Sequence, residues 1–334
     1  MADDNRLPLA VALNGYGLAA GEPDGVRQEV LAWRDVVDVV ETAEETGYRA
    51  VFVPEIAARE AFSTLAGFAA ATSEIALATG VIRIDRRDLH TTALAAATVA
   101  DLSGGRFTLG LGSGRPIEST RRFVADVREA LRGGDVIAEE PAGGRVVIAG
   151  LDHPAPDVPL YLAALGPRMT ELAGEVADGV LLNWCTPERV ARARAEVGAG
   201  AERAARDPGD VAVAVYVRAC LGHDEPTALA ALREAAARYA AMPKYRRQFE
   251  AMGLGEPAAA AAGALAAGRL ADAPEALARA VCVWGGRDEA LARLAAYRDA
   301  GADLVVVYPV PALEAVSSIT GTILAAAPDP AVER

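Results

Sequence analysis

The sequence predicts an α/β protein of the (β/α)8 TIM-barrel class. Short apolar runs alternate along the chain with longer alanine-rich segments of helical spacing. Eight such runs occur, and strands that are buried on both faces of a parallel sheet read as continuous apolar runs. The chain has 334 residues, of which 52% are hydrophobic, so it can bury a full core. We therefore expect one barrel domain over residues 1–334.

Each predicted strand is a short apolar run, and the pattern is weakest at the seventh. The strands are expected at Leu9–Leu13, Ala50–Pro54, Ile75–Val81, Phe107–Gly112, Leu160–Ala164, Gly179–Leu182, Val211–Arg218 and Leu304–Tyr308. The segments between them carry apolar residues at helical spacing. Helices are expected at Val26–Thr46, Phe62–Thr72, Thr91–Leu102, Glu118–Arg132, Met169–Val176 and Pro187–Arg206.

Two segments are longer than barrel connections require. Residues 133–157 contain Gly-Gly pairs and prolines around Val146–Ile148, which predicts a hairpin-like insertion before the fifth strand. Residues 224–300 are too long for one crossover and are interrupted by prolines. We expect several short helices there, including the alanine-rich stretch 257–270, because alanine is the best helix former.

Charge and cysteine content narrow the class of function. A net charge of −13 argues against a nucleic-acid partner, which would need a basic face. Cys185, Cys220 and Cys282 are scattered without CxxC spacing, which fits reduced thiols in a cytoplasmic protein and predicts no metal site. No apolar run approaches ~18 residues, and the first residues form no apolar signal segment, so we expect neither membrane spanning nor export.

Glycine alternates at the end of the fourth predicted strand. Gly110, Gly112 and Gly114 fall on one face, where a bare ridge would let a flat or anionic ligand lie against the main chain. Ala78–Val81 ends the preceding strand with a second bare site. Two such strand ends predict a cofactor-binding surface at one end of a parallel sheet.

These strand ends lie within a longer pattern, which comprises Leu77–Ile82, Arg87, Ala95–Gly112 and Pro159–Met169. The pattern resembles the core signature of the bacterial luciferase-like oxidoreductases. Ala177–Trp184 is similar to the branch of that family that uses the deazaflavin coenzyme F420. The resemblance implies a luciferase-like TIM barrel that transfers a hydride between F420 and a small-molecule substrate. We also expect a homodimer.

The turn after the fifth predicted strand is the expected phosphate site. Gly166 permits close approach, Pro167 suits the first turn of a helix, and free amides at a helix start favour an anion. The resemblance implies that the cofactor phosphate lies between this turn and the loop after the fourth strand. The alternative is an ordinary strand-to-helix turn with an exposed arginine. The expected cofactor-binding residues are Gly112, Ser113, Gly114, Ala163, Ala164, Leu165, Gly166, Pro167 and Arg168.

The expected ring site rests on the resemblance. Members of this family have a non-prolyl cis peptide at the end of the third strand, and the matching bond here joins Gly80 and Val81. Trp184 follows the sixth predicted strand and could wall the ring or substrate pocket. The alternative for Trp184 is core packing, the commoner fate of tryptophan. Tyr308, the last residue of the final predicted strand, is a further candidate for the pocket wall.

Glu55 is the candidate catalytic residue. It lies at the end of the second predicted strand, where barrel enzymes place functional groups. Several F420-dependent relatives carry a carboxylate followed by a proton-transferring histidine here, whereas this chain has Ile56. Glu55 could bind the cofactor or move a proton. The alternative is a surface carboxylate paired with Arg59.

FMN remains the alternative cofactor, which would make the protein a luciferase-like monooxygenase. Some flavin-binding relatives place arginine where this chain has Ser113, which weakens that alternative slightly. A catalytically silent flavin-binding protein and a cofactor-free hydrolase are further alternatives, although no nucleophile and base are recognisable in the sequence. The acidic tail of F420 needs a cationic groove, for which the candidates are Arg83, Arg86, Arg87, Arg115, Arg121 and Arg122.

Overall fold

The computed structural model describes residues 7–13, 16–19, 27–56, 59–139, 145–148 and 150–328. Its main sheet contains ten strands, and eight of them alternate with helices along the chain. These eight are β1 (Leu9–Ala12), β4 (Ala50–Val53), β5 (Ala76–Thr79), β7 (Phe107–Gly112), β10 (Leu160–Ala164), β11 (Gly179–Asn183), β12 (Ala212–Leu221) and β14 (Leu304–Pro309).

The strand order shows that the sheet is closed. It runs β10-β11-β12-β14-β1-β4-β5-β7, and β7 also pairs with β10. Pairing along β7 and β10 is parallel, with Leu160 opposite Leu109 and Ala163 opposite Gly112. The protein is therefore a (β/α)8 TIM barrel, as predicted. The strands could be recognised because both of their faces are buried, which makes them apolar throughout: no residue of β1 is more than 1% exposed.

Six helices follow the predicted pattern closely. They are α1 (Trp33–Glu45), α2 (Ala61–Ala71), α3 (Leu89–Leu102), α4 (Ile117–Leu131), α5 (Pro167–Val176) and α6 (Pro187–Arg203). The first helix begins later than predicted, because Arg27–Val30 forms strand β3 and pairs antiparallel with β2 (Tyr16–Ala19). Residue periodicity could not reveal this hairpin, since a strand partner offers backbone hydrogen bonds that override local helix propensity.

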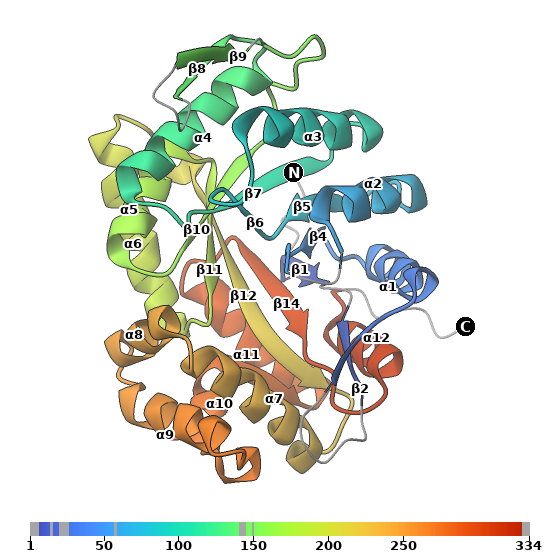
Figure 1. Cartoon of the computed structure of the whole chain (residues 1–334). Helices are drawn as coiled ribbons and strands as arrows, with labels where there is room; N and C mark the ends of the chain where they lie inside the picture. The colour runs from blue at the N-terminus through green and yellow to red at the C-terminus, as the bar shows by residue number, and fades with distance from the viewer. Residues whose placement is uncertain are drawn as a thin grey trace. The chain divides into compact units, whose positions relative to one another are not determined.

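The chain divides into two compact units. Unit 2 comprises residues 52–181 and 196–212 and holds β5, β7, β10 and helices α2 to α5. A short strand, β6 (Ile82–Arg83), pairs with the end of β7. Between α4 and β10, β8 (Val136–Glu139) and β9 (Arg145–Ile148) form an antiparallel pair beside α4 (Figure 1).

Unit 1 comprises residues 1–51, 182–195 and 213–334. Its long segment between β12 and β14 folds mainly into helices, of which the first, second and fourth pack against the third (Figure 1). The helices are α7 (Glu225–Ala240), α8 (Pro243–Ala251), α9 (Gly255–Ala266), α10 (Glu275–Val281) and α11 (Arg287–Asp299), and α12 (Ala315–Ala326) follows β14. Strand β13 (Cys282–Gly285), which was not predicted, pairs parallel with the last residues of β12. Across the described residues, no helix combines the length and apolar character of a membrane span.

Candidate functional site

The face of β7 that carries Gly110 and Gly112 is covered by the segment from Thr79 to Val81. A Cβ on Gly110 would lie 2.1 Å from the carbonyl oxygen of Thr79, and one on Gly112 would lie 2.7 Å from Val81 Cγ2. The expectation that this ridge stays bare for a ligand is therefore wrong at these two positions. Glycine is needed there because the end of β5 approaches β7 too closely for any side chain.

Two hydrogen bonds of the Thr79 side chain stabilise the close approach of β5 and β7. The Thr79 hydroxyl donates to the carbonyl oxygen of Gly110 at 2.9 Å and accepts from the Gly110 N–H at 2.7 Å. Thr79 is fully buried. Sequence reasoning passed over it, although a threonine directly before Gly80 in an otherwise apolar strand is a recognisable signal.

The peptide bond between Gly80 and Val81 is cis, as the resemblance implies. The N–H of Gly80 donates to the Val53 carbonyl at 2.8 Å, and the Val81 carbonyl accepts the N–H of Glu55 at 3.3 Å. The end of β5 is thus joined by backbone hydrogen bonds to the end of β4. These bonds bring the predicted ring site and the predicted catalytic residue together within unit 2.

Glu55 forms a two-point ion pair with Arg87. Arg87 Nε donates to Glu55 Oε2 at 3.0 Å, and Arg87 Nη2 donates to Glu55 Oε1. Arg87 Nη2 also donates to Glu60, and the Arg87 guanidinium lies 5.0 Å from the ring of Phe62. The side chains of Glu55 and Arg87 are only 20% and 17% exposed. Glu55 is therefore a largely buried, oriented carboxylate, and not simply a surface group.

The second carboxylate on Arg87 also caps a helix. Glu60 precedes α2 and accepts from the N–H groups of Phe62 and Ser63. Burial opposes ionisation of Glu60, but these N–H donors and the Arg87 charge together lower its pKa. The hydrogen bond to Glu55 is the main cause that raises the pKa of Arg87. The cluster of Glu55, Arg87 and Glu60 thus places two carboxylates around one fixed cation.

The predicted phosphate residues come from adjacent strand ends. Ala163 lies opposite Gly112 in the parallel pair β7–β10, so the loop at Ser113 and the turn at Gly166 leave neighbouring strands. Gly166 is the N-cap of α5, and no side chain caps that helix. A Cβ on Gly166 would meet nothing within 4 Å, and Gly166, Pro167 and Arg168 are exposed. The start of α5 is therefore open to an anion, although Pro167 carries no N–H and the N–H groups of Met169 and Thr170 donate to the Gly166 carbonyl.

The other predicted residues of this region differ in exposure. Ala164 is buried, whereas Ala163, Leu165 and Ser113 are half-buried. Gly114 has a φ of +54°, and a Cβ there would lie 2.4 Å from Asp85 Oδ1. The ion pair with Arg83 offsets the charge of Asp85 and lowers its pKa. An anion would therefore meet the open turn at Gly166 more favourably than the carboxylate beside Gly114.

Most arginines proposed for a cationic groove are already paired. Arg83 pairs with Asp85, Arg87 with Glu55 and Glu60, Arg121 with Glu175, and Arg122 with Asp126. Arg115 stacks on Phe123 at 5.5 Å. Within the part of the chain that the structure describes, only Arg86 and Arg115 of the six have no ion pair. The local cation supply is therefore smaller than the sequence alone indicates.

In unit 1, Trp184 follows β11 with a φ of +55° and is 1% exposed. Its ring packs against Tyr239 at 4.8 Å and Phe249 at 6.2 Å. Gln248 holds this turn, because its Nε2 donates to the carbonyls of Asn183 and Trp184. The Trp184 Nε1–H is buried and has no hydrogen-bond partner among the described residues. Trp184 is thus a packed residue with an unused donor, and a role as pocket wall remains a prediction.

Arg218 of β12 is a feature that sequence reasoning missed. It is 3% exposed, and its guanidinium carbon lies 4.2 Å from the ring centroid of Tyr308 and 4.5 Å from that of Trp184. The rings of Tyr216 and Tyr239 lie 5.7 and 5.1 Å away. A single charged residue inside an apolar strand was the available signal.

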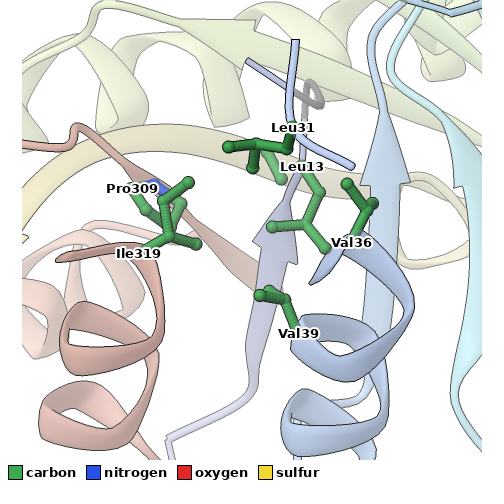
Figure 2. Close-up of a pocket in the computed structure, with 7 residues that line it drawn as sticks. Leu13, Leu31, Val36, Val39, Pro309 and Ile319 are labelled. Atoms are coloured by element: carbon green, nitrogen blue, oxygen red, sulfur yellow. The ribbon is translucent and has the colours of Figure 1, made fainter. Parts of the chain in front are cut away.

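An apolar cavity in unit 1 lies between α1, α12 and the ends of β1 and β14 (Figure 2). It is lined by Ala12, Leu13, Leu31, Val36, Val39, Pro309 and Ile319. Its interior of about 10 Å³ is near the lower limit for one water molecule. The lining residues are apolar, and none of them belongs to the predicted cofactor site.

One serine–histidine pair exists that the sequence did not reveal. His223 Nε2 lies 2.8 Å from Ser318 Oγ, which also accepts the N–H of Ala312. Ser318 is 2% exposed, so the pair fastens the start of α12 and offers no accessible nucleophile. The described residues contain no group of three or more side chains suited to hold a metal ion.

Comparison with known proteins identifies relatives in family and fold. Residues 15–304 match the model of the luciferase-like monooxygenase family. The chain is 36% identical over 204 residues to 5,10-methylenetetrahydromethanopterin reductase of Methanolobus tindarius, an alignment that covers 56% of this chain and 61% of that protein. It is 31% identical over 240 residues to F420-dependent glucose-6-phosphate dehydrogenase of Beutenbergia cavernae, covering 61% of this chain and 69% of that one.

The same fold occurs in the coenzyme F420-dependent tetrahydromethanopterin reductase from Methanopyrus kandleri. Its structure superposes with a TM-score of 0.78 at 22% identity and covers 96% of this chain and 98% of the other. The alignment with the Methanolobus protein, by contrast, spans less than two thirds of that protein's length. The match to the family model covers most of the chain and confirms the resemblance read from the strand ends. The chain belongs to the luciferase-like monooxygenase family.

Proposed function

We propose that the protein is an F420-dependent oxidoreductase that transfers a hydride to or from a small organic substrate. The observation that carries the proposal is the open, uncapped start of α5 beside the loop after β7. This arrangement suits a phosphorylated cofactor, because backbone amides and the helix dipole favour an anion. The F420 dependence named for two relatives supports the choice of cofactor.

Three parts of the chain would have separate roles in binding and catalysis. The Gly166 turn would hold the phosphate, and the Gly80–Val81 segment would support the ring. Bound F420 would supply the hydride-carrying ring, while the protein supplies binding, orientation and electrostatics. Glu55 would hold a proton, because each carboxylate oxygen keeps a second lone pair beyond its hydrogen bond to Arg87.

Cofactor choice is tested by titrating the purified apoprotein with F420 and, separately, with FMN. We expect tighter binding of F420, followed through the fluorescence of each ring. Equal or tighter binding of FMN would overturn the choice of cofactor and favour the monooxygenase alternative. Tight F420 binding without turnover of any reduced or oxidised substrate in a broad panel would indicate a silent binding protein.

The phosphate cradle is tested by Gly166→Val. The backbone at Gly166 has an ordinary φ of −111°, and a side chain there meets no protein atom, so the fold should be preserved. F420 affinity should nevertheless fall more than ~10-fold, or ~1.4 kcal/mol, because the isopropyl group occupies the approach to the amides.

Gly286→Val is the matched control. Gly286 is likewise the N-cap residue of a helix, α11, that has no capping side chain, and a Cβ on Gly286 would also meet open space. We expect this control to bind F420 like the unmodified protein. Normal affinity in Gly166→Val would place the cradle elsewhere.

The expected homodimer and cytoplasmic location remain predictions. Three buried free cysteines, Cys185, Cys220 and Cys282, support a reducing compartment. Burial raises the pKa of the Cys220 and Cys282 thiols to about 12, so both are unreactive. Sedimentation of the purified protein would measure the oligomeric state.

A further inference from the structure

Arg218 is a buried cation surrounded by aromatic rings. Its two hydrogen-bond acceptors are the amide oxygen of Asn183 and the phenol oxygen of Tyr239, the latter at 3.3 Å. In the regions that the structure describes, no carboxylate forms an ion pair with Arg218. Burial of a charge without a counter-ion destabilises the folded state, so an anion that binds Arg218 would be stabilising.

Two of the neighbouring tyrosines, Tyr216 and Tyr245, do not supply that counter-ion. Burial raises the pKa of Tyr245 to about 12 and holds the pKa of Tyr216 well above its usual value. Both phenols therefore stay protonated at neutral pH. The aromatic rings stabilise the cation through their faces by ~0.5–2 kcal/mol each, and they leave the edge of the guanidinium for hydrogen bonds.

We propose that Arg218 binds the carboxylate of a small organic acid. The edge formed by Nη1 and Nη2 presents two parallel donors, which match the two oxygens of a carboxylate. Asn183 and Tyr239 now occupy these two donors, and both residues are only half-buried, whereas Arg218 itself is 3% exposed. The carboxylate takes their places.

Nearby groups accommodate the exchange. Asn183 keeps a second hydrogen bond, from its Nδ2 to Tyr245 Oη at 3.0 Å, so its side chain remains anchored. The unused Nε1–H of Trp184 provides a further donor in the same cluster. One cation among aromatic rings balances one negative charge. A phosphate dianion would leave an excess charge buried, so a carboxylate is the better match.

The proposal stands on contacts within unit 1 and is independent of cofactor identity. Benzoate and benzamide are suitable probes, because they share a shape and differ in charge. Calorimetric titration should show that the intact protein binds benzoate at least ~10-fold more tightly than benzamide, and more tightly than inorganic phosphate. Equal binding of benzoate and benzamide, or tighter binding of phosphate, would overturn the proposal.

Two variants locate the site. Arg218→Met should abolish the preference for benzoate. Arg218→Lys keeps the charge and the fold but lacks the planar pair of donors, and should weaken benzoate binding several-fold. Undiminished benzoate binding in Arg218→Lys, or in a folded Arg218→Met, would contradict the assignment.

Arg279→Met is the matched control. Arg279 also stacks on a tryptophan, Trp284 at 5.2 Å, but pairs with Glu225 and Glu275. Loss of the Arg279 side chain should leave benzoate binding unchanged.

F420 titration of the Arg218 variants then identifies the source of the carboxylate. Normal F420 affinity indicates a free organic acid, whereas a parallel loss of affinity indicates the acidic tail of the cofactor. Absent F420 binding in the intact protein would remove the proposed cofactor and leave the benzoate result standing.

Discussion

Glu55→Gln is expected to slow hydride transfer by roughly 10² to 10⁴, which is an increase of ~2.7–5.5 kcal/mol in the activation barrier. Glutamine keeps the size of Glu55 and can still accept from Arg87, but it cannot take up a proton. Arg87 also keeps its second partner, Glu60, so the free energy of unfolding should fall by about 1.5 kcal/mol, as expected when one charge-assisted hydrogen bond is weakened. The measurements are single-turnover kinetics with F420 and a turned-over substrate, together with thermal unfolding.

Glu60→Gln separates proton transfer from charge balance. Glu60 is the other carboxylate on Arg87, and glutamine can still accept from the first N–H groups of α2. We expect the rate of this variant to stay within a few-fold of the original. Equal slowing in both variants would mean that orientation of Arg87 matters more than the proton on Glu55. An unchanged rate in Glu55→Gln would remove Glu55 from the mechanism.

Gly110→Ala should give the largest loss of stability. The added Cβ would lie 2.1 Å from the carbonyl oxygen of Thr79, and a backbone atom cannot move aside as a flexible side chain can. Overpacking of this kind costs about 1–3 kcal/mol. Separation of the strands would also weaken the two hydrogen bonds between Thr79 and Gly110, at about 1 kcal/mol each. We therefore expect the free energy of unfolding, measured in urea, to fall by at least ~2 kcal/mol.

The control for this variant is Gly263→Ala. Gly263 lies within α9, and a methyl group there meets nothing within 4 Å. Replacing an open helical glycine with alanine should raise the free energy of unfolding by up to ~1 kcal/mol. If Gly110→Ala proved as stable as this control, the end of β5 would be free to move away from β7, and the glycines of β7 would need another explanation.

The sequence by itself determined the barrel and most of its elements. Strands such as β1 are apolar throughout because both of their faces are buried, and that composition is visible without a structure. The family was also recognisable, since its motifs are short and contiguous, and the resemblance in turn implied the cis bond at Gly80–Val81. The exception among the early elements was β3, whose pairing with β2 depends on a partner that local periodicity does not reveal.

Only the tertiary structure decided which residues meet. It showed that the Gly110 ridge faces Thr79 and not a ligand, and that Arg87 holds Glu55. It also gathered Arg218, Trp184 and Tyr239 from a strand, a turn and an inserted helix into one cluster. Such contacts join segments tens of residues apart, and their geometry depends on strand register and helix packing. The pattern of residues along the chain determines which elements form, whereas the charge and burial at each site depend on what the folded chain brings beside it.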